Sequence, residues 1–318
     1  MSRVGKASPA VCVTGERQEN SIDLSNPETF AAGLPHEAFA ALRSTDGLYW
    51  NPMGDDDGFW AVTRHADIVE VSRDTSTYSS ALGHIQLYTI DDDALEARAS
   101  MIDMDPPMHT RLRRLVSSAF TPRHVQSYLA MIRDRASTLL DVYAAAGGGD
   151  FVEAISKPLP VGVICDILGV PEADHDQIVE MTDHLVEGTS ARPLDPGAYG
   201  NTTELRLLPF NSPAAHAVNE YARRLGDERR ANPSDDLMSK LVLAEVEGEH
   251  LSNAEIARFF QLMIFAGNET TRSTISHLAV AVAEFPAEFD RLRKNPDHID
   301  TAVEEIIRWT SAILYFRR

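Results

Sequence analysis

A carboxylate and a hydroxyl lie side by side in the middle of an apolar stretch, where they could move a proton. Residues 254–285 read AEIARFFQLMIFAGNETTRSTISHLAVAVAEF, with Gly267, Glu269 and Thr270 at the centre. Gly267 lets a large flat molecule approach the backbone. Thr270 can place its hydroxyl on the carbonyl of Ala266, four residues back, and Glu269 can relay protons into an apolar pocket. The spacing of these residues fits an alternative equally well, namely a polar helix turn that faces solvent or another helix.

The element that must carry these residues is one long helix. Ser252 and Glu255 form an S-x-x-E capping box before the apolar run, and Pro286 ends it. At about 1.5 Å per residue the helix is roughly 48 Å long, enough to cross a domain. The charged residues at its centre make a membrane span unfavourable, so we predict a core-crossing helix of a water-soluble protein.

A second group with chemical potential is a basic segment in an acidic chain. Residues 105–124 read DPPMHTRLRRLVSSAFTPRH. His109 and Arg113 are four residues apart on one predicted helix face, while Leu112 and Leu115 belong to an apolar stripe. Two converging cationic donors suit a carboxylate ligand, and the alternative is a solvated basic face.

A third pair, Glu305 and Arg308 in AVEEIIRW, is three residues apart and shares a helix face. Glu304 would pair with Arg308 equally well. By spacing alone such pairs are common on helix surfaces and indicate no function.

Composition restricts the class of protein. The 318 residues carry 29 Lys and Arg against 48 Asp and Glu, a formal charge of −19, which argues against nucleic-acid binding. The two cysteines, Cys12 and Cys165, are far apart and indicate no disulfide framework. The first 20 residues are polar and contain no apolar leader segment, so we expect a cytoplasmic protein without a transmembrane segment.

The predicted fold is mainly α with a small β region. We expect a mobile arm at residues 1–20 and a single domain at residues 21–318. Aromatic runs at 48–50 and 58–62 predict a hairpin. Helices are predicted near residues 34–43, 65–73, 107–119, 122–145, 159–169, 172–187, 214–230, 235–246, 254–285, 287–294 and 300–310.

Three segments together resemble one family. AGNETT at 266–271, DPPMHTRLRRLVSSAFTPR at 105–123 and EEIIRW at 304–309 are similar to motifs of bacterial cytochromes P-450, in the same order. The resemblance implies the cytochrome P-450 fold, with haem b as cofactor and monooxygenation of an apolar substrate as the reaction.

The resemblance also implies a role for each motif. Glu269 and Thr270 would deliver protons to iron-bound dioxygen, with Ala266 and Gly267 against the haem. The haem propionates would be held by His109 and Arg113, and by Arg318 near the end of the chain, with Arg317 the weaker alternative. The Glu305–Arg308 pair would be structural, buried on the proximal side.

Partners follow from the same resemblance. Arg111 and Arg114 would help to form a basic proximal surface for a ferredoxin, which receives electrons from NAD(P)H through a ferredoxin reductase. Substrate contacts are expected in residues 79–103 and 188–213. The alternative is that the apolar side chains of these segments only anchor loops to the core. The segments DLSNPETF and GFWAVTRHADI resemble actinobacterial members that oxidise steroid side chains, branched lipids or terpenoids.

The axial cysteine of the family, in a Phe- and Gly-rich loop before the last long helix, has no counterpart in this sequence. Cys165 has an apolar helical context and Cys12 a polar one, so neither is expected to bind iron. We therefore expect an incomplete cytochrome P-450 domain, lacking the cysteine loop and last helix and inactive alone. The alternatives are a truncated, non-catalytic ligand-binding or regulatory relative, and a helical scaffold that never bound haem.

Overall fold

The computed structural model describes residues 22–31, 33–45, 47–53, 57–82, 87, 100–117, 120–186 and 213–318. The chain separates into two compact units, Met1–Tyr78 and Ser79–Arg318, each of which is treated by itself. The predicted arm and most of the two predicted substrate-contacting stretches lie outside the described residues.

The first unit contains a β-hairpin between short helices. Its elements are η1 (Pro27–Phe30), α1 (His36–Ser44), β1 (Tyr49–Met53), β2 (Asp57–Ala61) and α2 (His65–Arg73). Trp50 and Trp60 face each other across the strands, with ring centroids 5.0 Å apart. The side chain of Asn51 is fully buried and accepts a hydrogen bond of 2.7 Å from the backbone N–H of Leu24. The predicted hairpin is confirmed.

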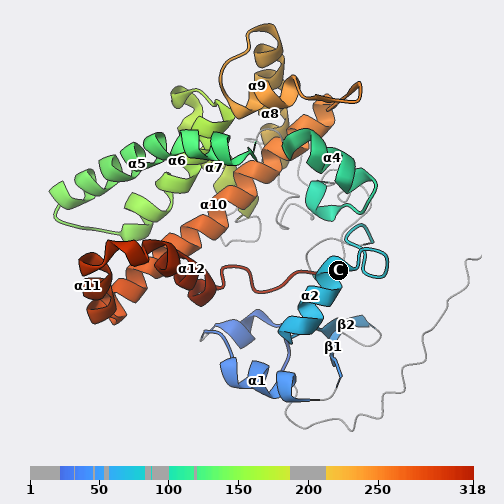
Figure 1. Cartoon of the computed structure of the whole chain (residues 1–318), viewed down its shortest axis with the longest axis vertical. Coiled ribbons are helices and arrows are strands. Elements are labelled where there is room, and N and C mark those ends of the chain that lie inside the picture. Colours follow the sequence, from blue (N-terminus) through green and yellow to red (C-terminus); the bar gives the residue numbers. More distant parts are fainter. Residues whose placement is uncertain are drawn as a thin grey trace, which may run out of the picture. The chain divides into compact units, whose positions relative to one another are not determined.

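The second unit is almost entirely helical (Figure 1). Its helices are α4 (Met108–Ser117), α5 (Pro122–Ala145), α6 (Pro158–Leu168), α7 (His175–Val186), α8 (Pro213–Ala231), α9 (Leu237–Val242), α10 (Asn253–Glu284), α11 (Pro286–Lys294) and α12 (Ile299–Thr310), with short helical turns η2 (Met101–Asp103), η4 (Val152–Ser156), η5 (Glu172–Asp174) and η7 (Pro296–His298).

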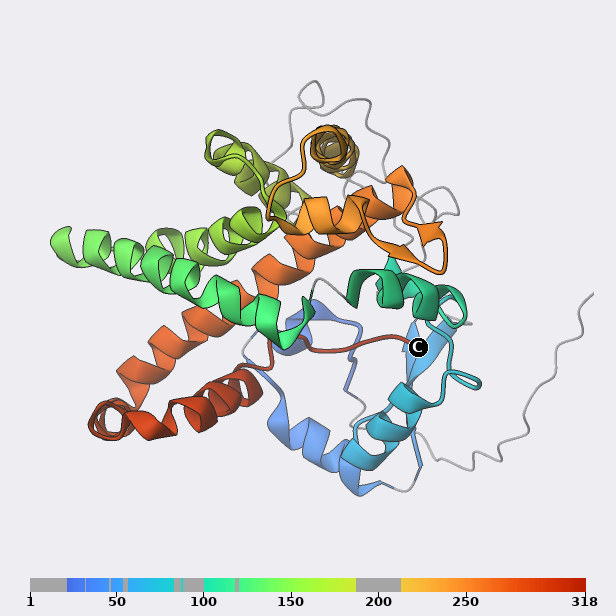
Figure 2. The same ribbon diagram turned by 45° about the horizontal axis from the view of Figure 1, so that its top comes forward.

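One apolar core joins the helices of this unit. Leu115 of α4, Leu168 of α6, Ile178 of α7, Leu225 of α8 and Phe260 of α10 are all buried in it. The helix α10 packs against both α6 and α8 and runs through the unit, as Figures 1 and 2 show. The capping box at its start is present, with both reciprocal hydrogen bonds. The prediction of a long core-crossing helix is confirmed.

Burial along α10 is uneven. Every buried residue of this helix lies between Ile256 and Asn268. From Glu269 onward its side chains are half-buried or exposed, and Leu278 and Val280 are among the exposed ones. The helices α11 and α12 follow at that end of α10 (Figure 2) and present exposed apolar side chains, including Phe289 and Ile307.

The helix predicted at residues 235–246 is wrong in its second half. The helix α9 ends at Val242, and the chain then forms a small antiparallel hairpin, β3 (Glu245–Val246) and β4 (Glu249–His250). Glu247 and Gly248 make its two-residue turn with φ of 56° and 80°. Positive φ at both central positions matches the right-handed strand twist, and glycine adopts it without steric cost.

Candidate functional site

The polar turn of α10 has the geometry that the sequence predicted. The hydroxyl of Thr270 donates a hydrogen bond of 3.1 Å to the carbonyl oxygen of Ala266. Ala266 is exposed and Thr270 half-buried, so this strip of the helix is open to a ligand. Glu269 lies beside it and forms an ion pair of 3.2 Å with Arg272. The structure thus brings together an acid, a hydroxyl and a small side chain on one turn.

Gly267 lies against a neighbouring helix. A side chain at this position would meet Cδ1 of Ile164 in α6 at 3.0 Å. The absent side chain permits the close packing of α6 on α10, because a Cβ at this position would require the end of the Ile164 side chain to shift. The predicted place of Gly267 and Ala266 beside a cofactor stays a prediction.

Asn268 is a residue that the sequence analysis missed. Its side chain is 1% exposed, and neither its amide oxygen nor its amide nitrogen has a hydrogen-bond partner among the described residues. A buried, unsatisfied amide destabilises the fold. The only sequence signal was its place inside the AGNETT motif.

The helix α4 presents two basic side chains that have no partner among the described residues. His109 is half-buried and Arg113 exposed, and their side chains make no hydrogen bond or ion pair with any residue that the structure describes. They are four residues apart on one face, while Leu112, Leu115 and Val116 anchor the helix in the core. Two unpaired donors on an anchored helix are suited to an anionic ligand such as a carboxylate.

A third cation approaches the start of the same helix. The positive charge of Arg318 contributes to lowering the pKa of Asp105, which lies three residues before α4. The larger causes of that shift are hydrogen bonds from the Ser79 hydroxyl and the Ser80 backbone N–H. Arg318 thus acts on a carboxylate that lies just before α4.

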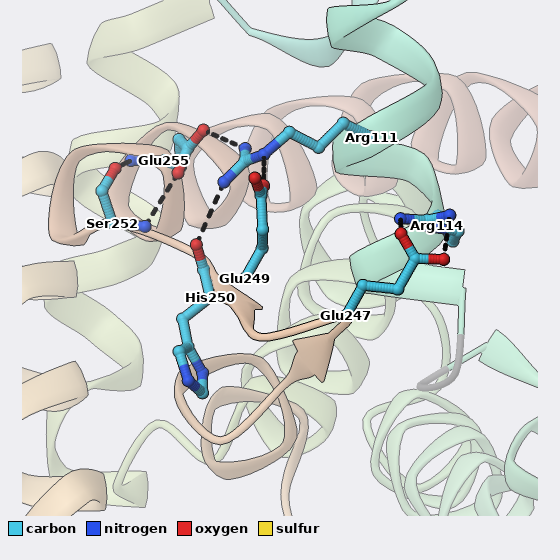
Figure 3. Close-up of polar contacts among 7 residues, drawn as sticks. All are labelled: Arg111, Arg114, Glu247, Glu249, His250, Ser252 and Glu255. Carbon is cyan, nitrogen blue, oxygen red and sulfur yellow. Dashed lines mark hydrogen bonds and ion pairs between the residues drawn. The ribbon is translucent and has the colours of Figure 1, made fainter.

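The other two arginines of α4 are engaged within the protein. Figure 3 shows Arg111 and Arg114 reaching the β3–β4 hairpin and the start of α10. Arg111 pairs with Glu249 and Glu255, and Arg114 pairs with Glu247 at 3.1 Å. The two arginines are thus paired with three glutamates, and their predicted part in a basic docking surface stays a prediction. No local pattern in the sequence indicates these pairs, since the partners are more than 130 residues apart.

The Glu305–Arg308 pair forms as predicted but is not buried. Both guanidinium contacts to the carboxylate are 2.7 Å long. The side chains of Arg308 and Glu305 are 69% and 59% exposed. Among the described residues no element covers this face of α12, so the expectation of a buried pair is wrong for this structure. Exposed pairs of this kind contribute little to stability.

Cys165 is a buried structural residue, as the sequence indicated. It is fully buried in α6, and burial together with the neighbouring Asp166 carboxylate raises the pKa of its thiol to about 12. A protonated thiol is a poor metal ligand and nucleophile. Cys12 lies outside the described residues. Within the described ranges, no cluster of His, Cys, Asp and Glu side chains is arranged to hold a metal ion.

The state of Cys165 leads to a testable expectation. The folded chain at pH 8 should leave this thiol unmodified by iodoacetamide, whereas the urea-unfolded chain should be alkylated readily. Peptide mass spectrometry of the α6 peptide measures both. Rapid alkylation of the folded chain would show that the thiol is accessible and ionised, contrary to this assignment.

No helix among the described residues is long and apolar enough to cross a membrane.

Comparison with known proteins gives a consistent result. Residues 28–309 match the family model for cytochrome P450. The chain is 35% identical over 295 residues to a steroid C26-monooxygenase of Mycolicibacterium smegmatis, covering 90% of this chain and 66% of that protein. It is 38% identical over 291 residues to a methyl-branched lipid omega-hydroxylase of Mycobacterium tuberculosis, covering 88% and 65%.

Solved structures agree with this assignment. The fold superposes on a Mycobacterium marinum cytochrome P450 in complex with pseudoionone with a TM-score of 0.78 and 39% sequence identity, covering 92% of this chain and 72% of that one. The chain spans about two thirds of the length of the curated relatives above.

Proposed function

Because this chain belongs to the cytochrome P450 family, we propose that it carries the haem-propionate and proton-delivery residues of a cytoplasmic monooxygenase. The reaction would insert one oxygen atom of O2 into an apolar substrate and release the other as water. Electrons would come from NAD(P)H through a ferredoxin reductase and a ferredoxin. The relatives named steroid C26-monooxygenase and methyl-branched lipid omega-hydroxylase support a steroid side chain or branched lipid as the substrate class.

The observation that carries the proposal is the pair of unpartnered cations on α4. His109 and Arg113 point from a core-anchored helix and have no partner among the described residues, while Arg318 is close enough to act on Asp105 just before this helix. These three basic side chains suit the two carboxylates of haem b. A site for an anion accounts for the lack of a partner for His109 and Arg113 among the described residues, whereas the neighbouring Arg111 and Arg114 are both in ion pairs.

The residues of the polar turn of α10 would take part in the reaction. Bound haem would supply the activation of oxygen. Ala266 leaves room beside α10, and the Thr270 hydroxyl, held by the Ala266 carbonyl, is placed to donate and accept protons at that strip. Glu269 is its proton source, and the Arg272 partner keeps this carboxylate oriented.

Removing the α4 cations tests the proposal. The double variant H109A/R113A should bind ferric haem about 100-fold or more weakly, since each hydrogen bond to a charged group contributes about 1.5–3 kcal/mol. Haem titration followed by absorbance measures the affinity, and circular dichroism shows whether the variant is folded. The matched control is R114A, which removes an exposed arginine of the same helix that pairs with Glu247. Equal affinity in H109A/R113A and the native chain would contradict the assignment.

A second candidate function is favoured by Cys165. With its thiol buried and protonated, this cysteine cannot supply a thiolate ligand. A non-catalytic ligand-binding or regulatory relative fits that observation. Sequencing the gene beyond the codon for Arg318 discriminates between the two: continuation into a Phe- and Gly-rich loop with a cysteine supports the monooxygenase, and an immediate stop codon supports the second candidate.

A further inference from the structure

We infer that Arg111 is a positioning residue, which holds α4 in a fixed orientation against the start of α10 and so places His109 and Arg113 relative to the Thr270 turn. The inference rests on the proposed function and deepens it. Neither the family motifs nor the relatives' names assign this role.

The guanidinium of Arg111 is satisfied on three sides at once (Figure 3). Its Nε pairs with Glu249 of β4, its Nη1 donates to Oε1 of Glu255 at 2.7 Å, and its Nη2 donates to the backbone carbonyl of His250 at 3.1 Å. One side chain of α4 therefore joins the hairpin and the first turn of α10. Only a planar fork of donors can reach all three acceptors, so lysine cannot replace it.

The two carboxylate oxygens of Glu255 bind different partners. Oε1 receives Arg111, while Oε2 accepts the backbone N–H of Ser252 at 2.8 Å to complete the capping box. Burial alone would raise the pKa of this carboxyl, but hydrogen bonds from Ser252 and Arg111 outweigh burial and hold the pKa below its ordinary value. The carboxylate is thus ionised at neutral pH, and α10 begins at the point where α4 is attached.

The position of Arg111 on α4 explains how it would orient His109 and Arg113. It lies two residues after His109 and two before Arg113, which is about 200° around the helix from either of them. The core residues Leu112 and Leu115 resist translation of α4 away from the core. The Arg111 fork resists its rotation, and rotation is the motion that would turn His109 and Arg113 away from a ligand. Glu255 is eleven residues before Ala266, about 16 Å along a continuous helix, so the two sites share one rigid element.

A double-mutant cycle tests this inference. R111A should lower the affinity for ferric haem about 10-fold, in the range of coupling between residues of one network. R111K should recover little of the loss, because lysine lacks the fork. In the H109A/R113A background, R111A should change the affinity less than two-fold, since it acts through those two side chains. A residue that only stabilised the fold would lower affinity equally in both backgrounds.

The control is R114A together with E247Q. This exposed ion pair also joins α4 to the hairpin, but it does not touch α10. Neither variant should change the haem affinity or the Soret circular-dichroism band of bound haem. R111A, in contrast, should broaden that band. The two proposals fail separately. If H109A/R113A has no effect, the proposed function fails; if H109A/R113A weakens binding and R111A does not, only the role of Arg111 fails.

Discussion

Replacing Asp236 with alanine should destabilise the second unit by about 3–5 kcal/mol, the range seen when one partner of a buried ion pair is removed. The Asp236 side chain is 8% exposed and pairs with Nε of Arg229. It also caps α9, because its carboxylate accepts the backbone N–H of Ser239 at 2.7 Å. Without the carboxylate, the Arg229 guanidinium would keep, among the residues that the structure describes, the Gly169 carbonyl as its one hydrogen-bond partner. Urea unfolding followed by circular dichroism measures the loss.

The matched control for D236A is D227A. Asp227 pairs with Arg230 at 3.0 Å on the exposed side of α8, and exposed pairs contribute about 0–1 kcal/mol. A loss below 1 kcal/mol in D236A, similar to that in D227A, would show that the buried pair does not hold α8, α9 and the end of α6 together.

The ion pair between Asp236 and Arg229 predicts how the stability of the second unit depends on pH. Burial alone would raise the pKa of Asp236, but hydrogen bonds from Ser239 and Arg229 lower it below its ordinary value of 3.8. A carboxyl whose pKa is lower in the folded state stabilises the fold above its unfolded pKa, and this contribution is lost as pH falls through the folded value. The difference in unfolding free energy between the native chain and D236A should therefore be constant from pH 8 to 5 and shrink below about pH 4.

Replacing Thr270 with alanine should separate electron consumption from product formation in the active monooxygenase. Positioned proton transfer contributes typically about 10²–10⁴-fold to a rate, and the Thr270 hydroxyl is the group of α10 placed for it. We expect product per NAD(P)H consumed to fall about 10-fold or more, with hydrogen peroxide or water formed instead. Simultaneous assays of NAD(P)H oxidation, peroxide and hydroxylated product give this ratio.

Thr274 supplies the control for T270A. Its hydroxyl donates to the Thr270 carbonyl at 2.8 Å, the same kind of bond one turn later. T274A therefore removes a bond of the same kind but leaves the Thr270 hydroxyl and its bond to the Ala266 carbonyl in place, and product per NAD(P)H should stay unchanged. Full coupling in T270A would remove Thr270 from the reaction.

Local signals in the sequence predicted most of the helices. The Thr121 cap before Pro122 marks the start of α5, and the predicted helix at 122–145 has the observed bounds. Gly169 adopts φ of 77° and ends α6, as glycine commonly does after a helix. The Ser252 capping box likewise marks α10. These signals are readable because each depends on residues within a few positions of one another.

The features that the sequence did not predict are mostly interactions between distant residues. The hairpin was missed because two-residue strands carry almost no periodicity, although Glu247 and Gly248 formed a turn signal. The role of Gly267 depends on Ile164, a hundred positions earlier. The internal use of Arg111 depends on Glu249 and Glu255, which no local pattern connects to it. The spacing of His109 and Arg113 predicted a common face, whereas only the fold shows that no residue in the described part of the chain pairs with their side chains.

The uneven burial of α10 has a consequence for how the second unit opens. Segments with few buried apolar contacts exchange their amide hydrogens through low-energy local openings, whereas core segments exchange only on global unfolding. The part of α10 up to Asn268 contains all the buried residues of the helix, whereas the part after it, like α11, has none. We therefore expect the amides after Asn268 to exchange faster than those before it. The residues proposed to move protons lie at the border between a slowly and a rapidly exchanging half of one helix.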